Sequence, residues 1–167
     1  MAMYKNLFLL AIFIVSLVVS SCSSDDEPKT NDSIFSVNNT KIGSKDIFYT
    51  VCEYNSLLGE TLFEVNFKYD DDTYMLQISL PTVNSLEDLE VGDEFDADEF
   101  IIYKFYSKYS VFIGNEDYEP ISGTVKVKSK SAKAIVMDFS NFKFRRELGS
   151  KTETFTITGS ISYTIYN

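Results

Sequence analysis

The fold class is decided near the end of the chain, where residues 155–165 read FTITGSISYTI. Every second residue from Phe155 to Ile165 is apolar or glycine, and every residue between them carries a hydroxyl group. Successive side chains of a β-strand point to opposite faces of a sheet, so this period of two predicts a strand with one buried face. The chain therefore ends in a half-buried strand.

The same alternation extends backwards through most of the chain. Residues 121–128 alternate between apolar or small residues and Ser, Thr or Lys. The return stretch 134–144 changes its apolar phase near Ser140 and Asn141, and a slip of this kind is typical of a β-bulge. Further strands are predicted over residues 34–37, 46–54, 62–69, 74–80 and 100–113, the last of these as one bent strand or two.

Turn-forming residues separate these strands. Asn38-Asn39 and Asp70–Asp72 are short polar runs that tolerate positive φ, and residues 114–120 are expected to form a loop. One helical turn is expected over residues 85–90, where Ser85 can act as its cap. About 8–10 strands with at most one short helical turn predict an antiparallel all-β domain. Both a lipocalin-like barrel and a two-sheet sandwich satisfy the pattern.

Two glycine motifs mark the C-terminal third, Gly123-Thr124-Val125 and Gly159-Ser160-Ile161. They resemble the start and the finish of the last two strands in small all-β surface lipoproteins of the Bacteroidetes type. That likeness covers residues 121–167 and implies families without an assigned activity.

The N-terminus has the parts of an export signal. Lys5 gives a positive start, and the 13 residues 7–19 are apolar apart from Ser16. A membrane-spanning helix needs about 20 residues, so this run is too short for a permanent span.

A cysteine follows the apolar run. Val19-Ser20-Ser21-Cys22 resembles the bacterial lipobox, in which Cys22 is acylated and becomes the first residue of the mature protein. The next residues resemble the export signal of Bacteroidetes-type surface lipoproteins: Ser24, Asp25, Asp26 and Glu27. The resemblance implies a lipoprotein held in the outer membrane by fatty-acyl chains such as palmitate, facing the cell exterior.

These signals divide the chain into three expected parts. Residues 1–21 are expected to be a lipoprotein signal peptide, and residues 22–33 the acylated Cys22 with a flexible acidic tether. Residues 34–167 are expected to form a single all-β domain.

The composition excludes several kinds of partner and catalytic site. Without the signal peptide the chain has 14 basic and 25 acidic side chains, a net charge of −11, which disfavours nucleic acid as a partner. The chain has no His, so serine or cysteine triads and His-ligated zinc are impossible. Cys52 is the one thiol besides Cys22, and we expect it to be a small buried hydrophobe. We expect no cofactor and no catalytic residue, with a carboxylate-based glycosidase as the one enzymatic alternative.

Acidic residues are densest over residues 87–99. Asp93, Asp96 and Asp98 are a weak candidate for Ca²⁺, whose ligands are oxygen atoms. The spacing does not match an EF-hand, so a solvated acidic loop is the simpler interpretation.

Basic residues are concentrated at the C-terminal end. Residues 22–122 carry 6 basic and 22 acidic side chains, whereas residues 123–167 carry 8 and 3. Four basic residues alternate with apolar ones on neighbouring strands and are expected to point outward together: Lys126, Lys128, Lys143 and Arg145. They either pair with acidic neighbours across strands or bind an anionic partner such as a uronic-acid glycan.

Tyrosines offer a further candidate surface. Stacking against sugar rings is one interpretation of Tyr103, Tyr106, Tyr109 and Tyr118, and ordinary sheet packing is the other.

The leading functional prediction is a non-catalytic binding or accessory module at the cell surface. Its ligand is expected to be a glycan, a small apolar molecule or a surface protein. The alternative is a structural or docking subunit of a larger surface complex. A concave apolar pocket would favour the small ligand, whereas a filled interior with an exposed patch would favour recognition at the surface.

Overall fold

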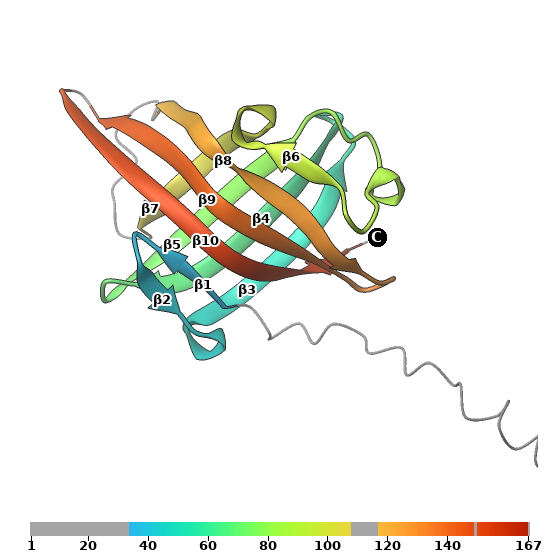
Figure 1. Ribbon diagram of the computed structural model, residues 1–167, viewed down its shortest axis with the longest axis horizontal. Coiled ribbons are helices and arrows are strands. Elements are labelled where there is room, and N and C mark those ends of the chain that lie inside the picture. Colours follow the sequence, from blue (N-terminus) through green and yellow to red (C-terminus); the bar gives the residue numbers. More distant parts are fainter. Residues whose placement is uncertain (1–33, 108–116, 149, 167) are drawn as a thin grey trace, which may run out of the picture.

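The computed structural model describes residues 34–107, 117–148 and 150–166. Within these ranges the chain forms strands and single 3-10 turns (Figure 1). The strands are β1 (Ile34–Val37), β2 (Thr40–Ile42), β3 (Ile47–Asn55), β4 (Glu60–Tyr69), β5 (Asp72–Leu80), β6 (Glu94–Asp96), β7 (Ile101–Ser107), β8 (Asp117–Lys130), β9 (Ala134–Leu148) and β10 (Lys151–Ile165).

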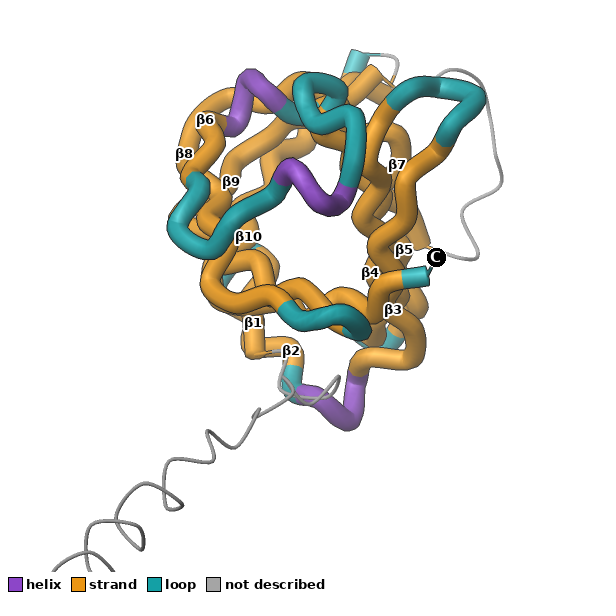
Figure 2. The backbone as a smooth tube through the Cα atoms, turned by 90° about the vertical axis from the view of Figure 1, so that its right-hand side faces the viewer, coloured by secondary structure: helices purple, strands orange, loops and turns teal. Residues whose placement is uncertain are grey.

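The strands form one sheet that curls into a half-barrel (Figure 2). Its order is β6-β8-β9-β10-β3-β4-β5-β7, with β1 paired to both β10 and β2. The pairs are antiparallel except β10–β3, where Thr164 lies opposite Val51 in a short parallel contact. The all-β, mainly antiparallel prediction is confirmed, and the sheet is a barrel-like one rather than a two-sheet sandwich.

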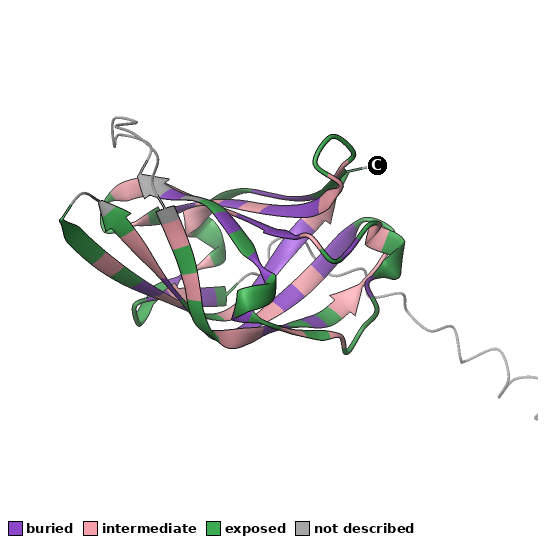
Figure 3. Ribbon diagram, turned by 90° about the horizontal axis from the view of Figure 1, so that it is seen from above, coloured by how far each residue is buried: buried purple, intermediate pink, exposed green. Residues whose placement is uncertain are grey.

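The last strand has the half-buried form that its sequence predicts. Ile157, Ile161 and Tyr163 are fully buried on the concave face, while Thr158 is exposed on the convex face. Ser162 is the exception, because it is buried although the alternation predicts that it faces outward. This alternation along the strands is visible in Figure 3.

The predicted β-bulge in β9 is also confirmed. Ile157 of β10 lies opposite Phe142, whereas Gly159 lies opposite Phe139, so Ser140 and Asn141 together stand against the single residue Thr158. Because of this slip Phe139 and Phe142 both reach the core, although three residues separate them.

The two glycine motifs have a common physical basis. Gly123 and Gly159 have φ of 97° and 111°, which side chains of L-residues rarely permit. A Cβ on Gly123 would lie 2.2 Å from the backbone oxygen of Asn141, and a Cβ on Gly159 would lie 2.5 Å from that of Ile34. Both glycines therefore allow a neighbouring strand to approach closely.

The predicted polar turns have the expected backbone. Asn38 and Asn39 have φ of 49° and 68° between β1 and β2, and Asp70 and Asp71 have φ of 51° and 62° between β4 and β5. Consecutive positive φ values suit tight hairpins because they match the twist of the flanking strands.

The prediction of a loop over residues 114–120 is wrong for its last four residues. Asp117 to Pro120 are the first residues of β8 and pair with Glu147 to Phe144 of β9. Pro120 is tolerated there because it stands at a register shift, where a missing N–H costs little. The same shift leaves Ile121 exposed, although alternation predicts that it faces the core. The predicted strand over residues 109–113 lies outside the described residues.

The predicted helical turn is the 3-10 turn η2 (Leu86–Asp88). Ser85 caps it by accepting a hydrogen bond from the Glu87 N–H at 3.1 Å. Lys130 of β8 donates to the carbonyls of Leu86 and Leu89 at 2.6 and 2.7 Å, which ties this turn to the sheet. Two more single turns occur, η1 (Ser44–Asp46) and η3 (Ala97–Glu99).

Cys52 is fully buried, as predicted, and burial raises the pKa of its thiol. No helix among the described residues is long and apolar enough to cross a membrane.

Candidate functional site

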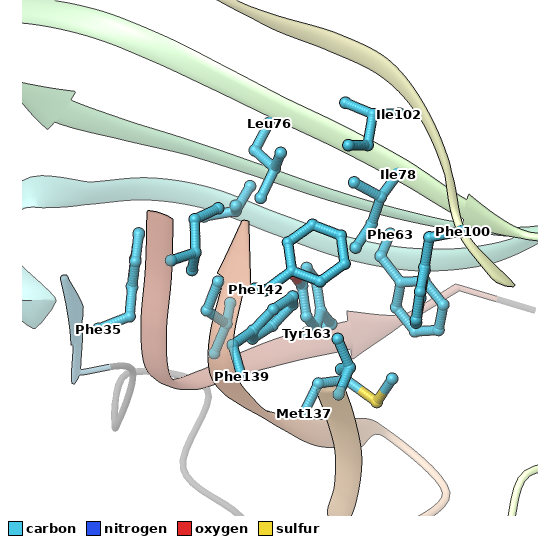
Figure 4. Packing of buried hydrophobic residues seen from close by; sticks show 14 of the residues in the cluster. Phe35, Phe63, Leu76, Ile78, Phe100, Ile102, Met137, Phe139, Phe142 and Tyr163 are labelled. Atoms are coloured by element: carbon cyan, nitrogen blue, oxygen red, sulfur yellow. The ribbon is translucent and has the colours of Figure 1, made fainter. Parts of the chain in front are cut away.

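The concave face is occupied by aromatic and aliphatic side chains. Figure 4 shows Leu76 and Ile78 of β5 pointing toward Phe139 of β9 and Tyr163 of β10. A chain of ring contacts runs through this core, with centroids 5.1 to 6.3 Å apart, over Phe35, Phe67, Phe105, Phe144, Phe142 and Phe100. Contacts of this kind add to the stabilisation that burial provides. The inward-facing side chains therefore meet across the half-barrel.

Side chains bridge the opening between β7 and β8. The Tyr118 hydroxyl donates to the Phe105 carbonyl at 2.9 Å, and Arg146 Nη1 donates to the same carbonyl at 3.4 Å. Arg146 Nη2 also donates to Glu153 Oε2 at 2.5 Å, and its guanidinium lies 5.7 Å from the Phe155 ring centre. The hydrogen bond from Arg146 holds the pKa of Glu153 below its ordinary value. This arrangement joins the two sides of the half-barrel.

Arg146→Met is expected to lower the free energy of unfolding by about 2–3 kcal/mol, because it removes charge-assisted bonds in a largely buried site. The matched control is Lys151→Met, since Lys151 is 76% exposed and 3.6 Å from Glu153. That variant is expected to cost less than about 1 kcal/mol. Denaturant unfolding near neutral pH measures both.

The same pair predicts a pH dependence. The pKa of Glu153 is lower in the folded protein than in the unfolded chain. Its contribution to the free energy of unfolding is therefore present above the ordinary Glu pKa of about 4.3 and is lost as the pH falls through the pKa of the folded protein. The wild-type protein is expected to lose more stability than Arg146→Met on acidification below roughly pH 4.3. Equal losses in the two proteins would contradict this role for the pair.

The basic residues singled out in the sequence do lie on the convex face, but three of them have partners. Lys126 Nζ is 3.8 Å from Glu94 of β6, and Arg145 forms an ion pair with Glu119 of β8. Lys128 donates to Ser160 Oγ at 3.1 Å.

Lys143 is exposed and stands opposite Ser122 and Thr156 in the sheet. Pairing with acidic neighbours across strands therefore accounts for Lys126 and Arg145. Lys143 and Lys128, whose partner is an uncharged hydroxyl group, remain available to an anionic partner.

The acidic residues of the calcium hypothesis have local roles. Asp93 accepts a hydrogen bond from the Glu90 N–H at 2.7 Å, and the Asp96 N–H donates to Glu99 at 2.8 Å at the start of η3. In the part of the chain that the structure describes, no three His, Cys, Asp or Glu side chains form a group that could hold a metal ion. The structure therefore does not support a Ca²⁺ site formed by Asp93, Asp96 and Asp98.

The two candidate tyrosines whose side chains the structure describes do not share a surface. Tyr118 lies at the β7–β8 opening, and Tyr103 donates to Glu60 at 2.7 Å on the other side of the sheet. The Tyr106 side chain and Tyr109 lie outside the described structure, as do Cys22 and the export residues Ser24, Asp25, Asp26 and Glu27.

A polar network crosses the convex face of β4 and β5. Glu64 Oε1 accepts from Asn66 Nδ2 at 2.9 Å, and its Oε2 accepts from Gln77 Nε2 at 3.2 Å. All three side chains are partly buried, and Glu64 stands opposite Gln77 in the register. The carboxylate thereby fixes the orientation of both amides.

Two tyrosines border this network. Tyr49 of β3 lies opposite Asn66 and is 45% exposed. Tyr166 follows β10, is 56% exposed, and donates its N–H to the Cys52 carbonyl at 3.2 Å, which keeps it beside β3. Burial and the charge of Glu64 raise the pKa of Tyr49, and Tyr166 contributes to the same shift. We call Tyr49, Glu64, Asn66, Gln77 and Tyr166 the convex-face cluster.

Sequence reasoning places Glu64 and Asn66 on the polar side of one strand but does not single out the cluster. Its members come from three neighbouring strands and the chain end, so only the register of the sheet brings them together. The available signal is the placement of Glu64, Asn66 and Lys68 opposite the apolar face of residues 62–69.

No protein-family model, curated protein or solved structure matches this chain.

Proposed function

We propose that the protein is a lipid-anchored lipoprotein of the outer membrane that acts outside the cell as a non-catalytic binding or accessory module. Support for the anchor comes from the lipobox-like Val19-Ser20-Ser21-Cys22 and the acidic run behind it. In this arrangement two or more acyl chains on Cys22 hold the domain at the membrane.

One observation carries the binding role: the convex-face cluster is a polar network whose side chains are already oriented. Binding groups that are fixed beforehand lose less conformational entropy when a ligand binds. The concave face, in contrast, is packed with side chains from opposite parts of the sheet. The module therefore recognises its partner at its outer surface rather than inside the half-barrel.

A docking subunit of a larger surface complex is the second candidate, and the β3–β4 turn favours it. Leu57 is 95% exposed and Leu58 is 54% exposed. Both backbone N–H groups donate to Asn55 Oδ1, at 3.0 and 3.2 Å, so the turn presents these leucines in a fixed geometry. Exposed apolar residues of this kind suit a protein partner.

Cys22→Ala is expected to abolish labelling with a fatty-acid probe in growing cells and to release the protein from the membrane fraction. The matched control is Cys52→Ala, which removes the buried thiol and leaves the lipobox intact. It is expected to label as the wild-type protein does. External protease should digest the wild-type protein on whole cells.

Two results would contradict the proposed lipid anchor and the proposed location outside the cell. One is labelling of Cys22→Ala at the wild-type level. The other is complete protection of the wild-type protein from external protease on cells whose control surface proteins are digested.

A further inference from the structure

The convex-face cluster combines two kinds of binding group. Tyr49 and Tyr166 offer exposed aromatic rings, while Glu64, Asn66 and Gln77 offer hydrogen-bonding atoms between strands β4 and β5. The network leaves specific atoms available. Each amide uses one N–H for the carboxylate, and among the described residues no hydrogen bond reaches Asn66 Oδ1 or Gln77 Oε1.

These available atoms define the chemistry of a ligand. Two amide oxygens accept hydrogen bonds, the remaining amide N–H groups donate them, and the carboxylate has unused lone pairs. A ligand with adjacent hydroxyl groups can donate to the oxygens and accept from the N–H groups at once. A ring with apolar C–H groups on its face can pack against a tyrosine. Sugar rings have both features.

Charge narrows the sugar class. Glu64 lies in the middle of the cluster, with Glu53 close enough to raise the pKa of Tyr49 further. Residues 22–122, which include four of the five cluster members, carry 6 basic and 22 acidic side chains. The carboxylates of Glu64 and Glu53 would repel an anionic sugar at this position, whereas they would not repel a neutral one.

We propose that the convex-face cluster binds a neutral oligosaccharide, with Tyr49 and Tyr166 packing against sugar faces and Glu64, Asn66 and Gln77 bonding to hydroxyl groups. The inference deepens the proposed function and rests on it, because it names the ligand of the same outer surface. The register of the sheet holds these side chains side by side on one face, which suits a chain of sugar rings lying along it.

The test is binding of the acylated protein, purified in detergent, to immobilised neutral, uronic-acid and amino-sugar oligosaccharides. We expect binding to a neutral member of the panel that changes little with salt, since no ion pair forms. Calorimetry with that oligosaccharide then compares variants. Tyr49→Ala is expected to weaken binding by about 10-fold and Gln77→Ala by about 3-fold to 10-fold.

Thr154→Ala is the matched control, because Thr154 is exposed on the convex face of β10, away from the cluster. It is expected to leave affinity within about 2-fold. Gln77→Ala truncates a partly buried polar side chain without changing the core, so it keeps the test informative if Tyr49→Ala lowers stability.

Three results would overturn the inference. They are no binding to any neutral oligosaccharide, neutral binding that survives both cluster variants, and binding of uronic acids that Lys143→Glu abolishes. None of these contradicts the proposed function, whose own test is acylation at Cys22 and exposure on whole cells.

Discussion

Gly123→Ala is expected to lower the free energy of unfolding by more than about 3 kcal/mol. Two costs add at this position. The φ of 97° is strained for any L-residue, and the new Cβ would lie 2.2 Å from the Asn141 oxygen and 2.7 Å from the Phe142 nitrogen. Both contacts are backbone atoms, so no side chain can rotate away. The strands β8 and β9 would have to separate at the bulge.

Gly59→Ala separates these two costs. Gly59 also has a positive φ, of 71°, but a Cβ there would meet nothing within 4 Å. That variant is expected to cost about 1–2 kcal/mol, the usual penalty for an L-residue in a left-handed conformation. Urea unfolding of the two variants measures the difference. Equal losses would mean that the close approach of β8 to β9 does not determine the requirement for glycine at residue 123.

Phe105→Ala is expected to cost about 3–5 kcal/mol, because Phe105 is fully buried in the centre of the aromatic core. Its ring centre lies 4.5 Å from that of Phe155 and 5.1 Å from that of Phe144. These two neighbours come from the other side of the half-barrel, so the cavity cannot close without moving the sheet.

The matched control for Phe105→Ala is Phe48→Ala. Phe48 stands at the bulge of β3 and is 61% exposed, so its truncation is expected to cost less than about 1 kcal/mol. Thermal unfolding of both variants checks the prediction. A loss at residue 105 no larger than at residue 48 would contradict the account of the packed concave face.

Much of the fold follows from local sequence. The period-two pattern of β10 predicts its buried face, and the phase change at Ser140-Asn141 predicts the bulge, because both depend on side chains a few residues apart. Paired Asn and Asp residues likewise predict the tight hairpins at residues 38–39 and 70–71, since these side chains tolerate positive φ.

Features that depend on distant contacts could not be predicted in the same way. The parallel contact of β10 with β3 joins residues more than a hundred positions apart, and nothing local specifies it. Asp117–Pro120 form a strand only because β9 extends far enough for Phe144 to Glu147 to pair with them. The convex-face cluster needs the register of β3, β4 and β5, which alternation alone does not give.

The sheet brings side chains from the acidic first part of the chain into contact with side chains from its basic C-terminal part. Lys126 meets Glu94, Arg145 meets Glu119, and Lys130 meets the carbonyls of η2. Three of the eight basic C-terminal residues thus join β6, η2 and the first half of β8 to neighbouring strands.

Recognition on the convex face, rather than inside the half-barrel, is tested most directly by nitrogen-15 NMR during titration with a neutral oligosaccharide. We predict that the side-chain amide signals of Asn66 and Gln77 shift together with the backbone signal of Tyr49. The backbone signals of Phe105 and Tyr163, on the concave face, should stay in place. Shifts at Phe105 and Tyr163 with unchanged side-chain amides of Asn66 and Gln77 would contradict the account.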